Sequence, residues 1–255
     1  MSYLNTAPLV WGFVDGPQKG RVDLTFAVPS ICAERVATGV ADLGLNPVIE
    51  IERNGFDWLP GIGIACRGPV RSILLVTRKP FDDIRTLATD TGSRTSIELA
   101  RIILSRKYGV EPALLPMAPD LKRMLDAADA ALLIGDAALM VEPTDLNHAC
   151  LDLGEEWVEM TGLPMVFALW SGPPAGCRQE LAPLFLESAH YGQSHIESIV
   201  EHEADLRGFT KTLVRRYFEK NVRLFLDETD YEGMRLYLQY AAELQPAALV
   251  ESEAN

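Results

Sequence analysis

The stretch Ser72-Ile73-Leu74-Leu75-Val76-Thr77 is an apolar run that follows turn residues, which predicts a buried strand. We expect this strand to carry the chain out of a first lobe into a middle segment, and the apolar run at 164–170 to bring it back. Two crossings of this kind are typical of a two-lobed protein whose ligand lies in the cleft between the lobes. The predicted lobes are residues 1–76 with 170–255, which include the C-terminal helices, and residues 77–169.

Short apolar runs alternate with helix-like patterns along most of the chain, which predicts an α/β fold with a largely parallel sheet. Ser30 precedes the first clear helix as a candidate N-cap, and Gly109 follows the second, where a terminal glycine is favoured. Beyond the turn at 171–176 the pattern is helical. The predicted strands are 23–27, 43–46, 59–66, 72–77, 86–89, 130–134 and 164–170, and the predicted helices are 31–38, 96–108, 181–190, 194–206, 209–218 and 230–244.

The composition bounds the class of protein. The 255 residues are 48% hydrophobic, which is enough to bury a sizeable core. A net charge of −13, from 36 acidic against 23 basic residues, disfavours a nucleic-acid partner, because that affinity comes mainly from Lys and Arg. An anionic ligand would need local hydrogen-bond donors to bind against this field.

The cysteines and the apolar runs indicate in which cellular compartment the protein is expected. Cys32, Cys66, Cys150 and Cys177 form no C-x-x-C pair, so neither a zinc site nor a disulfide framework is indicated. No apolar run reaches the roughly 18 residues that span a bilayer, and no secretion signal precedes the first strand. We therefore expect a cytoplasmic protein with no membrane partner. Turn residues so close to Met1 also lead us to expect further residues upstream.

The first nine residues, Met1-Ser2-Tyr3-Leu4-Asn5-Thr6-Ala7-Pro8-Leu9, have the chemistry of a strand-to-helix turn. Pro8 suits the first turn of a helix, and Asn5 or Thr6 can cap the amides there. We expect Ser2–Leu4 to pair in the sheet. Asn5 would then lie at the carboxyl end of that strand, where α/β sheets bind ligands.

A second run, Asp90-Thr91-Gly92-Ser93-Arg94-Thr95-Ser96, follows a predicted strand and leads into a helix. Exposed amides at a helix N-terminus form an anion site, and Arg94 adds a guanidinium. An ordinary capped helix is the alternative, since Ser and Thr are favoured caps wherever a helix begins. No P-loop pattern is present.

Three further runs also place turn or hydroxyl residues next to a predicted strand. Val28-Pro29-Ser30 places a hydroxyl after a predicted strand, although a simple N-cap would explain it equally well. In Ile134-Gly135-Asp136-Ala137-Ala138, Gly135 allows a ligand close to the backbone, and Asp136 is either a helix cap or a substrate contact. Gly68-Pro69-Val70-Arg71-Ser72 forms a turn where the lobes join.

Other features favour no particular chemistry. His195 and His202 are seven residues apart on one predicted helix, whereas metal pairs on a helix are usually four apart. Gly61-Ile62-Gly63 lacks the third glycine of a dinucleotide site, and no G-x-S-x-G is present.

Taken together, these runs resemble the futalosine-pathway chorismate dehydratase family, which acts first in an alternative route to menaquinone. The resemblance covers nearly the whole chain. Its residues are Ser2–Thr6 with Pro8 and Leu9, Val28–Ser30, Gly68–Val70 with Ser72, Ser93–Ser96, Ile134–Ala138, and Gly162–Pro164 with Phe167–Trp170.

The resemblance implies a two-lobed α/β fold of the periplasmic-binding-protein type II kind, used without export. It implies conversion of chorismate to 3-[(1-carboxyvinyl)oxy]benzoate and water. No metal or organic cofactor is implied, because aromatisation of the ring drives the reaction. The substrate-binding residues that we expect are Ser30, Ser72, Arg94, Thr95, Ser96, Gly135 and Asp136.

The same resemblance makes Asn5 the residue most closely tied to catalysis. An amide is a poor base, so we favour a substrate carboxylate as proton acceptor, with Asn5 holding the geometry. Two other functions stay open: 1,4-dihydroxy-6-naphthoate synthase, which is expected to use a histidine, and a non-catalytic solute-binding or sensor protein. A homodimer through the C-terminal helices also stays open.

Overall fold

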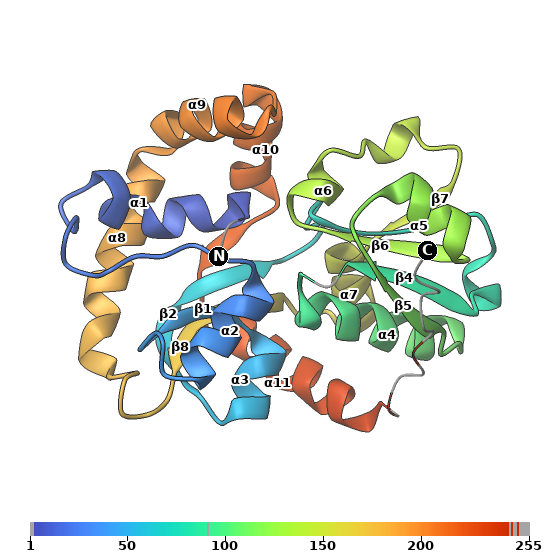
Figure 1. The fold of residues 1–255 in the computed structure, drawn as a ribbon, viewed down its shortest axis with the longest axis horizontal. Coiled ribbons are helices and arrows are strands. Elements are labelled where there is room, and N and C mark those ends of the chain that lie inside the picture. The colour runs from blue at the N-terminus through green and yellow to red at the C-terminus, as the bar shows by residue number, and fades with distance from the viewer. Residues whose placement is uncertain (1–2, 91, 245, 247–248, 250–255) are drawn as a thin grey trace. The chain divides into compact units, whose positions relative to one another are not determined.

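The computed structural model describes residues 3–90, 92–244, 246 and 249, and its chain divides into two compact units (Figure 1). Unit 1 comprises Met1–Cys66 and Val166–Tyr231, and unit 2 comprises Arg67–Met165 and Glu232–Asn255. The predicted lobes instead had 67–76 and 232–255 in the first lobe and 166–169 in the second. Strand pairing explains the first difference, because the strand at 73–77 pairs only with strands of unit 2.

Unit 1 is built on a four-stranded sheet in the order β1-β8-β2-β9. Its β1–β8 and β2–β9 pairs are both antiparallel. The strands are β1 (Gly44–Pro47), β2 (Asp57–Cys66), β8 (Met165–Gly172) and β9 (Arg223–Phe225). The helices are α1 (Ala7–Asp15), α2 (Pro29–Ala37), α3 (Val48–Asn54), α8 (Ala182–Ser194), α9 (Ile196–Arg207) and α10 (Lys211–Lys220), with 3-10 turns η1 (Leu4–Thr6) and η4 (Gln179–Leu181).

Unit 2 is built on a five-stranded mixed sheet in the order β5-β4-β6-β3-β7. The first three strands are parallel, while β3 runs antiparallel to both of its neighbours. The strands are β3 (Ile73–Thr77), β4 (Thr86–Asp90), β5 (Ala113–Met117), β6 (Ala130–Ile134) and β7 (Ala149–Asp152). The helices are α4 (Arg94–Tyr108), α5 (Leu121–Ala127), α6 (Asp136–Leu139), α7 (Leu153–Thr161) and most of α11 (Glu228–Glu243), with 3-10 turns η2 (Phe81–Asp83) and η3 (Pro143–Asp145).

Aromatic packing attaches α11 to unit 2. The Trp157 ring, on α7, packs edge-on against the rings of Tyr237 and Tyr240, with centroids 6.2 and 6.0 Å away. The Tyr237 hydroxyl also donates to the carbonyl of Thr95 at 3.1 Å. These contacts explain why 232–255 lies in unit 2 and not in the first lobe.

Several predictions about elements are wrong. The sheets are not largely parallel, because β1, β3, β7 and β9 have antiparallel neighbours. No strand forms at 23–27, where Phe26 is 51% exposed and no neighbouring strand pairs with the segment. Strands β5, β7 and β9 were not predicted.

The opening segment also differs from its prediction. Tyr3 lies in a bend and Leu4–Thr6 form a 3-10 turn, closed by the Thr6 N–H donating to the Tyr3 carbonyl at 3.1 Å. Ser2 lies outside the described residues. Because η1 continues directly into α1, with a proline in the first turn of that helix, the chain turns where a strand was expected.

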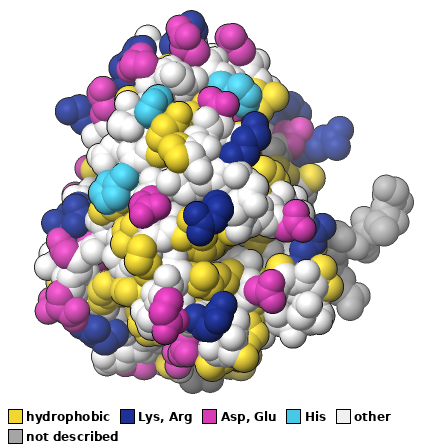
Figure 2. Space-filling model, turned by 90° about the vertical axis from the view of Figure 1, so that its left-hand side faces the viewer, with side chains coloured by type: hydrophobic (Ala, Val, Ile, Leu, Met, Phe, Trp, Pro, Cys, Tyr) yellow, Lys and Arg dark blue, Asp and Glu magenta, His cyan; other side chains and the backbone are white. Residues whose placement is uncertain are grey.

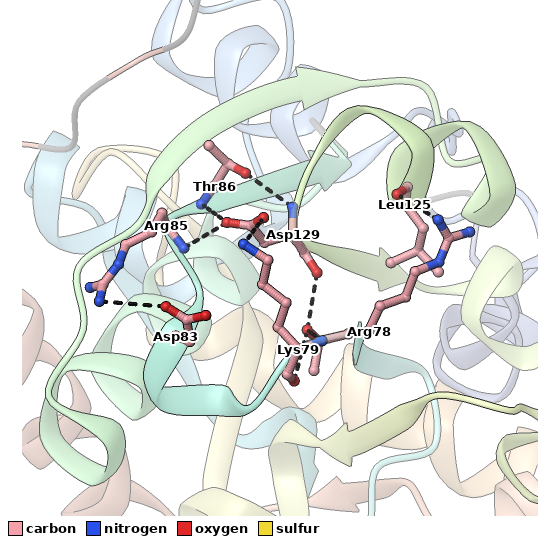
Figure 3. A network of polar contacts seen from close by, with 8 residues as sticks. Arg78, Lys79, Asp83, Arg85, Thr86, Leu125 and Asp129 are labelled. Carbon is pink, nitrogen blue, oxygen red and sulfur yellow. Dashed lines mark hydrogen bonds and ion pairs between the residues drawn. The ribbon is translucent and has the colours of Figure 1, made fainter.

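A polar network closes one edge of the unit 2 sheet, where β4 and β6 begin (Figure 3). The Asp129 carboxylate pairs with the Lys79 ammonium at 2.8 Å and accepts the N–H groups of Arg85 and Thr86 at 2.9 and 3.1 Å. The Thr86 hydroxyl accepts the Asp129 N–H in return, at 3.0 Å. This edge is therefore occupied by structural contacts, and the predicted site residues of unit 2 lie at the other edge.

Among the described residues, no helix is long and apolar enough to cross a bilayer.

Candidate functional site

Three of the predicted runs meet at one edge of the unit 2 sheet. Strands β4 and β6 are parallel, so their carboxyl ends, which lead to Ser93 and Gly135, lie at the same edge. Strand β3 is antiparallel to β6 with Ile73 opposite Ile134, which puts Ser72 there as well. The Gly135 N–H donates to the Ser72 carbonyl at 2.7 Å. The structure therefore joins runs that are far apart in the sequence.

The hydroxyl run forms the first turn of α4. Ser93 is the N-cap: its Oγ accepts the Ser96 N–H at 3.5 Å and lies 3.1 Å from the Ser96 Oγ. Thr95 and Ser96 are buried, whereas Arg94 is exposed. The capped-helix interpretation is thus confirmed. The buried hydroxyls remain at a helix N-terminus, where partial positive charge favours an anion.

Asp90 ends β4 beside this turn and is a residue to which the sequence analysis gave no role. It is only 7% exposed, and its Oδ1 accepts the Gly92 N–H at 2.9 Å. Burial raises the pKa of this carboxyl, and the Gly92 N–H opposes the rise only in part. An acid at the end of a predicted strand was the signal that could have pointed to it.

The turn that carries Ser72 is held by a second acid, the half-buried Asp152, at the end of β7. Its Oδ1 accepts the Val70 N–H at 2.9 Å and its Oδ2 accepts the Arg71 N–H at 2.5 Å. Burial raises the pKa of Asp152, while backbone N–H donors oppose the rise. Burial also raises the pKa of the nearby Cys150 thiol to about 11, so this thiol stays protonated at neutral pH.

The third run begins α6. Gly135 is its N-cap residue with φ 63° and ψ −134°, a conformation that glycine adopts readily and other residues rarely do. Asp136 is the first helical residue, one position beyond the cap, so the helix-cap interpretation of Asp136 is wrong. Its side chain is partly exposed.

Unit 1 carries the remaining two predicted residues. Asn5 lies half-buried in η1, and its Oδ1 accepts the Thr6 hydroxyl at 3.5 Å. Ser30 is the second residue of α2 and is half-buried. It is not the N-cap, because Val28 occupies that position and Pro29 begins the helix. The hydroxyl of Ser30 is thus not committed to capping.

None of the four histidines lies in these runs; His148 directly precedes β7, and the other three lie in unit 1. His190 stacks on Phe225, His195 stacks on Tyr191, and His202 meets the Trp11 ring edge-on. These three are exposed on or between α8 and α9. Figure 2 shows a face on which histidine side chains lie among charged and hydrophobic ones. Across the described ranges, no group of three or more His, Cys, Asp or Glu could hold a metal ion.

The sequence of this chain matches a known protein family over most of its length. A family model described as menaquinone biosynthesis matches residues 1–243. The chain is also 29% identical over 200 residues to the chorismate dehydratase of Thermus thermophilus, a match that covers 71% of this chain and 72% of that protein.

Solved structures share the fold. Protein AF1704 from Archaeoglobus fulgidus superposes with a TM-score of 0.67 at 16% identity, covering 94% of this chain and 92% of that one. The periplasmic aliphatic sulphonate binding protein of Escherichia coli gives 0.65 at 14% identity, covering 99% and 93%. The chain therefore has the α/β fold of the periplasmic binding proteins, as the sequence predicted.

Proposed function

Because this chain belongs to the menaquinone biosynthesis family, we propose that it is a chorismate dehydratase. The observation that carries the proposal is the match to the Thermus thermophilus chorismate dehydratase, which extends over 71% of the chain. The convergence of hydroxyl and amide groups at one sheet edge of unit 2 supports it. Chorismate has two carboxylates, and such groups bind carboxylates without a cofactor.

The reaction is the loss of one water. A proton leaves the ring carbon that bears the enolpyruvyl ether, and hydroxide leaves the neighbouring carbon. The electron pair of the broken C–H bond becomes the new ring double bond, and the ring is then aromatic. The proton and hydroxide together make the water, so the enzyme is a hydro-lyase.

The proposed binding residues supply mostly neutral donors. Ser72, Thr95 and Ser96 line the edge of unit 2 described above, with the Gly135 turn beside them. Arg94 is the cation of this set and is exposed, so it contributes through solvent-screened attraction. The full proposed set is Ser30, Ser72, Arg94, Thr95, Ser96, Gly135 and Asp136.

Asn5 is the proposed catalytic residue. Its amide has no useful basicity, so it orients the leaving hydroxyl or a carboxylate while a substrate carboxylate accepts the proton. The half-buried position of Asn5, at the start of a packed helix, suits such an orienting role.

A second candidate is a non-catalytic solute-binding protein, because solved neighbours of this fold include a sulphonate binding protein. Such a protein would bind chorismate and release it unchanged. The naphthoate synthase alternative draws no support from the three exposed histidines, since each packs against a neighbouring aromatic ring.

The test is incubation of the purified full chain with chorismate, followed by ultraviolet absorbance and mass spectrometry. A dehydratase yields a product lighter by one water with an aromatic spectrum. Binding measured by calorimetry with chorismate recovered intact would instead establish the solute-binding function. Boiled protein is the matched control, because chorismate also decays slowly without a catalyst.

A further inference from the structure

The turn Gly68–Ser72 contains a conformation that residues other than glycine usually avoid. Arg71 has φ 64°, and it is the one residue other than glycine with positive φ among those that the structure describes. A side chain with Cβ is disfavoured there, and such strain persists only where the surroundings impose it. Glycine would relieve this backbone strain, so the contacts of the arginine side chain must offset its cost.

Asp152 imposes the strained backbone. Its two carboxylate oxygens accept the consecutive N–H groups of Val70 and Arg71, and Oδ1 also accepts those of Gly154 and Glu155 at 3.0 and 3.2 Å. One acid thus joins the turn to the beginning of α7. The chain then reverses immediately, with the Ser72 N–H donating to the Val70 carbonyl at 2.7 Å.

The Arg71 guanidinium reaches away from this turn to α6 and the residues after it. Its Nη1 donates to the Ala138 carbonyl at 3.0 Å, and its Nη2 donates to the Val141 carbonyl. The Glu142 carboxylate lies 3.4 Å from Nη2. A planar fork of donors can hold two carbonyls at once, which a lysine cannot do with the same geometry.

These contacts close a ring. Asp152 fixes Arg71, Arg71 fixes the end of α6, and the Gly135 N–H at the start of α6 donates back to the Ser72 carbonyl at 2.7 Å. Every member belongs to unit 2. The Gly135–Ser72 hydrogen bond and the pairing of Ile73 with Ile134 already join these two residues, and the contacts of Arg71 and Asp152 brace that junction from the other side.

We propose that Arg71 and Asp152 are positioning residues that hold Ser72 and Gly135 in the geometry that binds the substrate carboxylate. This inference rests on the proposed function. Neither residue needs to touch the substrate. Each acts through the backbone of the residues beside it.

The first experiment measures hydrogen exchange of the full chain without substrate. Arg71→Gly keeps a residue that tolerates positive φ but removes the fork. We expect exchange at the amides of Ser72 and of 135–140 to rise about tenfold or more relative to wild type. Arg78→Ala is the matched control, because Arg78 is a half-exposed arginine of the same unit that pairs with Asp126. Its exchange at these amides should equal that of wild type.

The second experiment separates positioning from folding. In this proposal Ser72 binds the substrate carboxylate that does not accept the proton, so its displacement weakens ground state and transition state alike. We therefore expect KM to rise about tenfold and kcat to stay within about twofold. A variant that merely folds less well loses active enzyme, which lowers apparent kcat at unchanged KM. Arg71→Lys should have a KM between those of wild type and Arg71→Gly. Asp152→Asn, measured on folded protein, should have a KM above that of wild type.

Unchanged exchange in Arg71→Gly would overturn the proposal, and so would a fall in kcat alone. The proposed function fails separately, if wild type does not dehydrate chorismate. In that event the exchange result still decides whether Arg71 holds the two segments together.

Discussion

Asn5 occupies a short 3-10 turn and is therefore held more firmly than a residue in a loop would be. The turn is closed by a backbone hydrogen bond, and Leu4 and Thr6 on either side are buried. Leu4 is fully buried, so the backbone at Asn5 has little freedom. A fixed amide is what an orienting role requires.

We predict that Asn5→Ala lowers kcat for chorismate dehydration by about 100-fold or more, the scale of a lost positioning or electrostatic contact. Steady-state assays by ultraviolet absorbance measure it. The control is Asn147→Ala, an exposed asparagine in a loop of unit 2. Near wild-type turnover of the Asn5 variant would remove Asn5 from the mechanism.

Residue types and their order were readable from the sequence, whereas their partners were not. The hydroxyl run at 93–96 was recognised because a helix start has a local signature. The Arg71–Asp152 pair was missed, since the two residues are 81 positions apart and only strand pairing brings them together. The Tyr237 contact with Thr95 spans 142 positions and was missed for the same reason.

At the scale of elements, α1 and α8 cross very closely in unit 1. A Cβ built at Gly192 would lie far inside van der Waals contact with the Pro8 carbonyl oxygen. The Ser188 hydroxyl donates to the Leu9 carbonyl at 2.9 Å on the same face of α8. Because α1 continues directly from η1, this crossing also fixes the position of Asn5 within unit 1.

We predict that Gly192→Ala destabilises the protein by about 1–3 kcal/mol, the usual cost of overpacking, because α1 must shift away. Urea unfolding measures the change. The same shift should lower kcat, since Asn5 moves with α1. Gln193→Ala, on the exposed side of the same helix, should leave both stability and kcat unchanged.

The network around Asp129 links the beginnings of β4 and β6, and it makes a prediction about pH (Figure 3). Burial opposes ionisation of this carboxyl, but the Lys79 ammonium and the N–H groups of Arg85 and Thr86 outweigh burial and lower its pKa. A carboxyl whose pKa is lowered by folding stabilises the fold above its unfolded pKa of about 3.9. That contribution is lost as the pH falls through the folded pKa.

We predict that Asp129→Asn lowers the free energy of unfolding by about 1–3 kcal/mol at pH 7, and that its difference from wild type narrows below about pH 4. Urea unfolding at several pH values measures both. Asp145→Asn, an exposed aspartate in η3, is the control. A difference that is constant with pH would contradict the assigned cause.

The elements that were predicted correctly are those with strong local patterns. Strand β6 matched its predicted bounds, and α4 began within two residues of its own. Of the three unpredicted strands, β7 and β9 are short, and β5 contains Pro116, which weakens the strand pattern. Strand direction was also beyond the local pattern, because a strand has the same periodicity whichever way its neighbour runs.

For the whole molecule, the net charge of −13 sets how a dianion approaches. The field repels the substrate, and the proposed binding groups are mostly neutral hydroxyls and amides. Salt weakens long-range repulsion much more than short hydrogen bonds in a buried turn.

We predict that KM for chorismate falls about twofold between about 10 and 150 mM salt, as the screening length shrinks from about 30 to about 8 Å. Initial rates at fixed pH measure it. The control is Arg94→Ala, which should show the same or a steeper fall. A KM that rises with salt would mean that Arg94, and not the neutral groups, dominates binding.

The sequence by itself determined the α/β class, the order of the site motifs and the family, because composition, helix starts and short motifs are local properties of the chain. Only the tertiary structure decided that both sheets contain antiparallel strands and that most of α11 packs with unit 2. It also decided that Ser72, the first turn of α4 and Gly135 lie at one edge of the unit 2 sheet. Arg71 and Asp152 contact the segments that carry Ser72 and Gly135. These facts depend on pairing between distant segments, and burial of apolar surface across the whole unit selects that pairing.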